Sequence, residues 1–272
     1  MNIIISKITL LLLILTTSFQ SYAQKNSPYT TDFYKDGAWI VAGLGATAAG
    51  IIIAENKDEL TSVELSEKTK DDIWKLDRWA AGNYNESSNK ISDIPFYLSF
   101  ATPLLFGLNE DTRDNAGQIG VMYIESLSTT AALFNITSGL INKSRPLVYN
   151  NSGEVDFDER VEANSQRSFY SGHVAASAAA TFFAAQVFSD FFPNSNAKPF
   201  VWAGAATIPA VIAYLRIDAG KHFLSDTLVG YAMGALSGII IPRLHRKSSK
   251  NFKVSVGATD DAQTIGFSYK FR

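Results

Sequence analysis

Residues 168–189 read SFYSGHVAASAAATFFAAQVFS and contain no aspartate, glutamate, lysine or arginine. The uncharged run from Val174 to Ser189 is rich in alanine and predicts a helix that opens close to Gly172. A soluble amphipathic helix normally carries charged residues on its wet face every few positions. Their absence favours a helix inside a membrane.

Five further uncharged stretches of this kind occur along the chain, bounded by charges or by breakers such as Pro193 and Pro199. They are Ala38 to Ala54, Ile94 to Leu108, Ser126 to Asn142, Pro199 to Leu215 and Thr227 to Pro242. A membrane span needs roughly 17 to 25 apolar residues, so these stretches are short for that purpose. We expect an all-α fold, a six-helix bundle that is embedded in a membrane.

The whole chain has 272 residues with 46% hydrophobic content and a mean hydropathy of +0.02, which suits a well-packed helical protein. Its formal net charge is −2 and its isoelectric point is near 5.9, so it has no overall basic field and we expect no nucleic-acid partner. Because it has no cysteine, disulfide bonds cannot stabilise it. Its stability must come from helix packing.

The first residues read as an export signal. Lys7 precedes the apolar run Ile8 to Leu15, and Ser21 to Ala23 places small residues before an expected cleavage site. We expect a signal peptide over residues 1–23. An uncleaved membrane anchor is the alternative, but the run is shorter than the roughly 20 residues that a span requires.

The remaining chain divides into three parts: residues 24–37 as an N-terminal polar segment, 38–246 as the helical domain, and 247–272 as a basic linker with a C-terminal β-hairpin. The hairpin is predicted because apolar and polar residues alternate on either side of Thr259 to Asp261.

Chemistry is concentrated in three short motifs, which contain two of the three histidines of the chain. Lys143-Ser144-Arg145-Pro146 follows the third apolar stretch. Ser171-Gly172-His173 opens the fourth. Arg216, five residues, His222, three residues and Asp226 join the fifth stretch to the sixth. The order of the motifs makes the signal more specific than any one of them.

Taken in this order, the motifs resemble those of the type 2 phosphatidic acid phosphatase and vanadium haloperoxidase superfamily. The family pattern is a lysine, six residues and Arg-Pro, then Pro-Ser-Gly-His, then Ser-Arg, five residues, His, three residues and Asp. Tyr170 stands at the proline position here, and Ser138 stands where the family has its phosphate-binding lysine. The resemblance covers residues 126–243.

The resemblance implies a phosphohistidine mechanism. His222 would attack phosphorus, Asp226 would fix its ring, and His173 would protonate the departing alcohol. The spacing agrees with this, because Asp226 follows His222 by four residues, which is about one helical turn. Its carboxylate could then accept a hydrogen bond from one ring nitrogen and leave the other nitrogen free.

The resemblance also implies a phosphate-binding set. Arg145 and Arg216 would hold phosphate oxygens with their planar forks. The Ser171 hydroxyl and the backbone amides around Gly172 would act at a helix N-terminus, which favours an anion.

The missing lysine needs a substitute. We expect Lys143 to reach the phosphate, with Lys221 as a second possibility.

No metal ion is expected, because the sequence shows no group of histidines and carboxylates with ligand spacing. No other cofactor is expected either. His245 lies outside every motif in the basic run from Arg243 to Lys253, and we expect it to be solvated.

These features predict a metal-independent phosphatase of the bacterial cell envelope that hydrolyses a lipid phosphate or diphosphate. Its partners would be a membrane and a phospholipid or polyprenyl phosphate substrate. Three alternatives remain: a haloperoxidase with vanadate as cofactor, a non-catalytic phospholipid-binding scaffold, and a soluble periplasmic acid phosphatase.

The side of the membrane is also open. Six full spans after a cleaved signal would put the active site in the cytoplasm. The basic run after the sixth stretch favours a cytoplasmic C-terminus and an active site that faces the periplasm.

Overall fold

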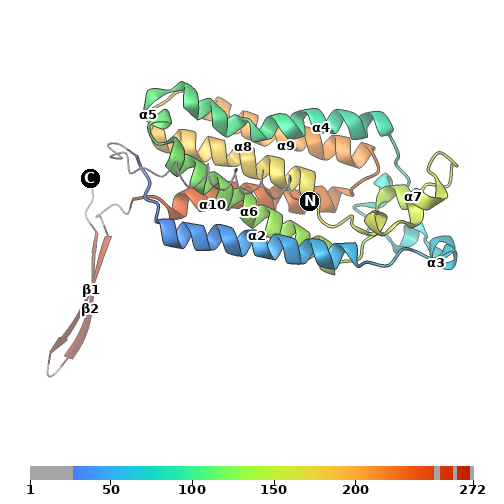
Figure 1. The fold of residues 1–272 in the computed structure, drawn as a ribbon, viewed down its shortest axis with the longest axis horizontal. Helices are drawn as coiled ribbons and strands as arrows, with labels where there is room; N and C mark the ends of the chain where they lie inside the picture. The colour runs from blue at the N-terminus through green and yellow to red at the C-terminus, as the bar shows by residue number, and fades with distance from the viewer. Residues whose placement is uncertain (1–26, 248–251, 260–261, 270–272) are drawn as a thin grey trace, which may run out of the picture.

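The computed structural model describes residues 27–247, 252–259 and 262–269 (Figure 1). The expected signal peptide over residues 1–23 lies outside the described residues.

Residues 27–247 form a bundle of long helices with short helices in its connections. The long helices are α2 (Phe33–Glu55), α4 (Glu86–Phe100), α6 (Ala116–Leu140), α8 (Gly172–Phe191), α9 (Lys198–Asp218) and α10 (Leu224–Leu244). The short α-helices are α3 (Ser62–Glu67), α5 (Glu110–Arg113) and α7 (Phe157–Val161). Five 3-10 helices are η1 (Lys70–Asp72), η2 (Arg78–Ala80), η3 (Thr102–Leu108), η4 (Pro146–Tyr149) and η5 (Ala163–Gln166).

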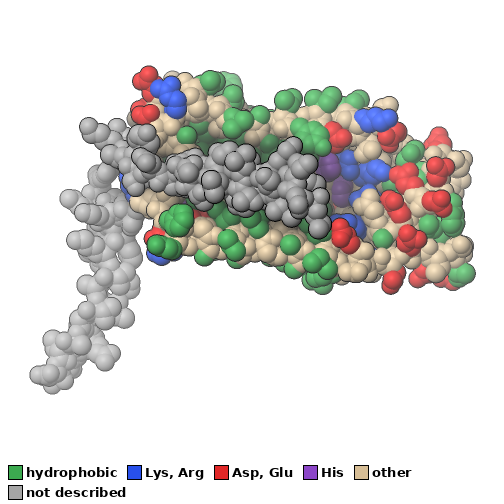
Figure 2. Space-filling model, viewed as in Figure 1, with side chains coloured by type: hydrophobic (Ala, Val, Ile, Leu, Met, Phe, Trp, Pro, Cys, Tyr) green, Lys and Arg blue, Asp and Glu red, His purple; other side chains and the backbone are tan. Residues whose placement is uncertain are grey.

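Six helical segments of the described chain are long and apolar enough to cross a membrane, with α4 and η3 counted as one segment. The apolar window of α8 is 67% buried inside the protein, whereas that of α2 is only 11% buried. Large hydrophobic side chains are exposed along the outer helices, and charged side chains gather around the loops that contain α3 and α7 (Figure 2). This distribution is that of a helical bundle surrounded by lipid, with α8 at its centre.

The central helix is approached closely by α10. A β-carbon on Gly230 or Gly238 would lie 2.5 Å from the carbonyl oxygen of Ser171 or Ala179, and one on Gly234 would collide with the backbone of Ala175. Small residues spaced by four let two helix backbones pack in this way. The contact holds the second motif, at the start of α8, against the helix that follows the third motif.

The helices start earlier than the uncharged stretches predict. Helix α4 begins at Glu86, where the side chain of Asn85 accepts a hydrogen bond from the backbone N–H of Ser88. Helix α6 begins at Ala116, because Gln118 and Glu125 are buried inside the bundle rather than placed in a loop. The uncharged stretches therefore did not predict these two helix starts, because polar residues near them are buried in the bundle.

The stretch from Ile94 to Leu108 is not one continuous α-helix. The α-helix ends at Phe100, and residues 102–108 continue as the 3-10 helix η3. Pro103 has no N–H to donate to the preceding turn. The hydroxyl of Thr102, which precedes Pro103, donates to the carbonyl oxygen of Ser99 over 2.7 Å.

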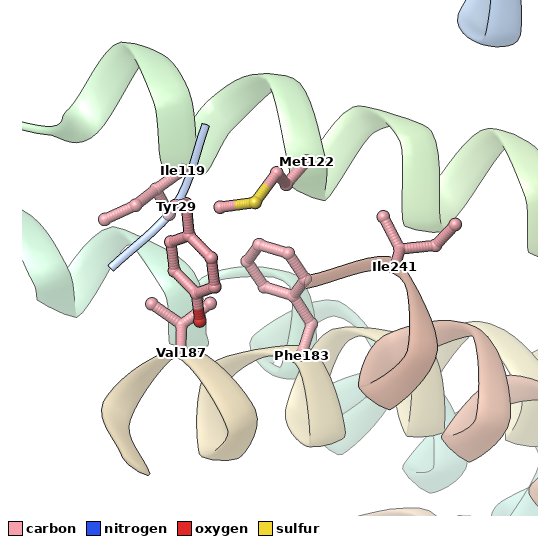
Figure 3. Packing of buried hydrophobic residues seen from close by; sticks show 6 residues of the cluster. All are labelled: Tyr29, Ile119, Met122, Phe183, Val187 and Ile241. Carbon is pink, nitrogen blue, oxygen red and sulfur yellow. The ribbon is translucent and has the colours of Figure 1, made fainter. Parts of the chain in front are cut away.

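A hydrophobic cluster ties the N-terminal segment to the bundle. Figure 3 shows side chains of α6, α8 and α10 meeting around the ring of Tyr29. The members are Tyr29, Ile119, Met122, Phe183, Val187 and Ile241. The Tyr29 hydroxyl donates to Asp190 over 2.7 Å, and its backbone pairs with that of Arg246.

One expectation for this end of the bundle is wrong. His245 is not a solvated residue of a basic tail, because it caps α10 and its side chain is only 13% exposed. It faces Asp36 of α2 and Glu125 of α6, so the fold does bring histidine and carboxylates together. The three residues are far apart in the sequence, and no spacing rule can connect them.

The last strands of the described chain are β1 (Phe252–Thr259) and β2 (Ala262–Tyr269). They pair antiparallel, with Phe252 opposite Tyr269 and Thr259 opposite Ala262. The residues between the two strands lie outside the described chain.

Candidate active site

The three motifs meet at the end of the bundle that carries α3 and α7. Arg145 follows α6, His173 is in the first turn of α8, Arg216 is in the last turn of α9, and His222 lies between α9 and α10. All four line one cavity of about 460 Å³. Figure 2 shows histidine beside a group of lysine and arginine side chains at this end.

His222 is held by the turn between α9 and α10. Gly220 has a positive φ of 72°, and its missing side chain makes room for the backbone of Asn83. The chain then folds back, and the N–H of His222 donates to the carbonyl oxygen of Arg216 over 3.3 Å. This turn brings a histidine and an arginine from one motif to the same cavity.

The imidazole of His222 is 3% exposed, and its Nδ1 lies 2.7 Å from the carbonyl oxygen of Ser168. A carbonyl oxygen only accepts, so this hydrogen bond places the proton on Nδ1 and leaves the lone pair on Nε2. Burial, followed by the positive charges of Arg216 and Arg145, lowers the pKa of His222 well below its usual value. The ring is therefore neutral and keeps one nitrogen free, as a nucleophile requires.

Asp226 does not contact His222 directly. Its Oδ2 accepts from the Ser168 hydroxyl over 2.6 Å and from the N–H of Phe223 over 2.9 Å, while its Oδ1 accepts from Lys143 over 2.7 Å. No hydrogen bond joins Asp226 to His222 among the described residues. Asp226 instead caps α10 and reaches His222 through Ser168, whose hydroxyl and carbonyl groups contact the two side chains. The expectation of a direct contact is corrected.

The structure does not bring Lys143 to the cavity. Its Nζ lies 3.0 Å from Asp77 and 2.7 Å from Asp226, and it stacks over the ring of Phe223 at 4.8 Å. Two carboxylates therefore neutralise it. Lys221, the second candidate for this role, is also neutralised, because it pairs with Glu159 over 2.8 Å.

A cation that the sequence did not predict lies beside Ser138, where the family has its lysine. Arg167 donates from Nε to the Ser138 hydroxyl over 3.2 Å, and both residues line the cavity. Its backbone forms a bridge with Lys143, which fixes the loop before the second motif. Ser138 is the residue that replaces the family lysine, so the guanidinium group fills the space beside it. An arginine four residues before Ser171 was the available signal.

Arg145 and Arg216 are held by neutral partners. Arg145 donates to Asn164 over 3.2 Å, and Arg216 donates to Asn89 over 2.8 Å. The Nε atoms of both arginines are buried without a hydrogen-bond partner in the described chain. Burial, Arg216 and Arg167 lower the pKa of Arg145 to about 10. Within the described residues, no carboxylate forms an ion pair with these three arginines, so the cavity is suited to an anion.

His173 lies on the other wall of the cavity. Its Nε2 is 3.4 Å from Asp93, and its ring packs on Phe96 with 4.2 Å between centroids. Gly172 also lines the cavity, where a β-carbon would lie 2.8 Å from the ring of Phe134. Ser171 does not line it, and its buried hydroxyl has no partner in the described chain.

Residues 120–250 match the family model described as the PAP2 superfamily. No match is found among the curated proteins. Among solved structures, the chain is similar to the crystal structure of the first transmembrane PAP2 type phosphatidylglycerolphosphate phosphatase from Bacillus subtilis. The identity is 19%, the alignment covers 78% of this chain and 96% of that chain, and the TM-score is 0.45. Since the segment that matches the family model holds all three motifs, this part of the chain belongs to the PAP2 superfamily.

Proposed function

We propose that this protein hydrolyses a phosphate or diphosphate group of a membrane lipid, through a phosphohistidine on His222 and without a metal ion. The observation that carries the proposal is one cavity that holds a neutral histidine with a free Nε2 and three arginines without carboxylate partners. Phosphoryl transfer is catalysed chiefly by positioning and by compensation of charge. The arginines Arg145, Arg167 and Arg216 provide that compensation.

The reaction runs in two steps. In the first, the lone pair on His222 Nε2 forms a bond to phosphorus while the bond from phosphorus to the lipid oxygen breaks. His173 gives its proton to the leaving oxygen, and Asp93 at 3.4 Å orients the ring. In the second, His173 takes a proton from a water molecule, whose oxygen attacks phosphorus as the phosphorus–nitrogen bond breaks. Inorganic phosphate then leaves.

A lipid substrate is supported by the apolar half of the cavity. Its walls beyond the arginines come from α4, α6 and α8 and include Phe96, Phe100, Leu127, Ala131, Phe134 and Ala176. Helices α4 and α6 pack on different sides of α8 (Figure 1), and both contribute apolar side chains to the cavity. A phosphate could sit among the arginines while its acyl or prenyl chain remains between α4 and α6.

The test is phosphate release by the purified full chain in detergent, with a chelator present. The panel contains a phosphatidate, a phosphatidylglycerophosphate, a polyprenyl diphosphate and a small soluble phosphate ester. We expect lipid phosphates to give the higher kcat/KM, and His222→Gln to abolish release without unfolding the protein. Equal rates on the soluble ester would contradict the lipid assignment. Full activity of His222→Gln would contradict the mechanism.

A further inference from the structure

A second group of titratable side chains lies at the end of the bundle remote from the active site. Asp36 is in the first turn of α2, Glu125 is inside α6, and His245 caps α10. The potential ligand atoms of the three all lie within 4.8 Å of one another. Helix α10 separates this group from His222 by about 30 Å, since a helix rises 1.5 Å per residue.

The imidazole of His245 is oriented as a ligand. Its Nδ1 is 2.9 Å from the carbonyl oxygen of Ile241, which fixes the proton on Nδ1. The lone pair of Nε2 then points toward the carboxylates, with 3.4 Å to Asp36 Oδ1 and 3.2 Å to Glu125 Oε2. A backbone carbonyl that holds the second nitrogen is the usual support of a metal-binding histidine.

One buried oxygen of Glu125 has no hydrogen-bond partner within the described chain. Its side chain is 3% exposed, and its Oε2 accepts no hydrogen bond within the described chain although it faces His245. A carboxylate inside an apolar helix is costly unless it is paired or binds an ion. The other oxygen of Asp36 is already used, because Oδ2 accepts from the N–H of Asp32 over 2.7 Å.

The nearby basic residues do not neutralise the two carboxylates. Arg243 donates to Gln186 over 3.0 Å, and Arg246 pairs with Asp190. In the part of the chain that the structure describes, no lysine or arginine forms an ion pair with Asp36 or Glu125. Two carboxylates beside a neutral imidazole would leave a charge of −2 in a buried place.

We propose that Asp36, Glu125 and His245 bind one divalent metal ion, with zinc as the best match. Tetrahedral zinc with bonds of about 2.0 to 2.1 Å keeps its ligand atoms roughly 3.3 Å apart, close to the separations from Nε2. The ion neutralises both carboxylates and satisfies the free oxygen of Glu125. It joins the first long helix to the last one through α6, and three protein ligands leave one position for water.

The test measures metal in the purified full chain after removal of any affinity tag. We expect about one zinc per chain by elemental mass spectrometry, because a structural or three-ligand site binds zinc tightly. After chelation, cobalt(II) titration should give the visible d–d absorption of a low-symmetry nitrogen and oxygen site. Glu125→Gln and His245→Gln should each weaken metal affinity at least tenfold.

Two matched controls separate this site from others. Glu110→Gln removes an exposed carboxylate whose one ion pair among the described residues is with Arg113, and His222→Ala removes the histidine of the candidate active site. Both should keep the metal. Wild-type protein that binds neither zinc nor cobalt(II) would overturn the proposal, and the group would be an ion pair with a protonated His245. Metal that still binds to Glu125→Gln and to His245→Gln with wild-type affinity would also overturn the proposal.

Discussion

At the scale of single residues, positive charge in the cavity comes from arginines that have neutral partners. Arg145, Arg167 and Arg216 are held by an asparagine, a serine and an asparagine in turn. This arrangement leaves their charge available for an anion. On the proposed function, we expect no need for a lysine at position 138, because the guanidinium group of Arg167 reaches the space beside Ser138.

The role of Arg167 is tested by exchange of the cation. Arg167→Ala should lower kcat/KM by about 10²- to 10³-fold, as loss of one charge-stabilising donor does in other enzymes. Adding Ser138→Lys to this variant should restore part of the activity, since an ammonium group would return to the same space. Arg113→Ala, on the exposed surface of α5, is the matched control. Unchanged kcat/KM of Arg167→Ala would contradict the proposed role of Arg167.

Burial of His222 makes stability depend on pH. Its pKa in the folded protein lies well below that of the unfolded chain, so the unfolded state binds more protons below about pH 6.5. Stability should be unaffected by this group above pH 6.5 and fall as the pH drops below it. At pH 5.5 the loss should be on the order of 1 kcal/mol. Thermal unfolding of wild type and His222→Gln at pH 5.5 and 7.5 measures the difference, and equal pH dependence would contradict it.

At the scale of helices, close packing of α10 on α8 sets the distance between the second and third motifs. Gly230→Ala places a β-carbon 2.5 Å from the carbonyl oxygen of Ser171, so the helices must separate. We expect a loss of about 1 to 3 kcal/mol in unfolding free energy, together with lower kcat. Gly204→Ala in α9 is the control, because a β-carbon there meets no atom within 4 Å. Its stability should stay equal or rise by up to about 1 kcal/mol.

The sequence predicted all six long helices, because a run without charges is readable from composition alone. It did not predict where α4 and α6 begin, since Asn85 acts as a cap and Glu125 is buried rather than exposed. In the site, the motif spacing predicted that His222 and Asp226 lie close together. It could not show that Ser168 stands between them, because that contact depends on how two loops meet.

At the scale of the whole molecule, contacts between distant parts of the chain account for the features that the sequence did not predict. Arg167, in the loop before α8, reaches Ser138 of α6, and Lys143 pairs with Asp77 in the connection between α2 and α4. Likewise, Glu125 and His245 come together only through helix packing. No local pattern contains these contacts, which is why the phosphate-binding cation was assigned to Lys143 from the sequence.

The side of the membrane that the active site faces is still a prediction. The chain has no cysteine, so single cysteines can report it. Glu154→Cys is exposed in the loop before α7, and Asn194→Cys is exposed at the opposite end between α8 and α9. A maleimide that does not cross the inner membrane should label position 154 and leave position 194 unlabelled in intact cells. The reverse labelling would place the site in the cytoplasm.

Detection of phosphate on His222 during turnover would test the proposed phosphohistidine mechanism most directly. The protein would be mixed with the best lipid phosphate, quenched in alkaline denaturant and digested, and the phosphopeptide would be identified by mass spectrometry. We expect phosphohistidine at His222, with none in His222→Gln. Rapid turnover with no phosphate on His222, or with phosphate on another residue, would contradict this mechanism.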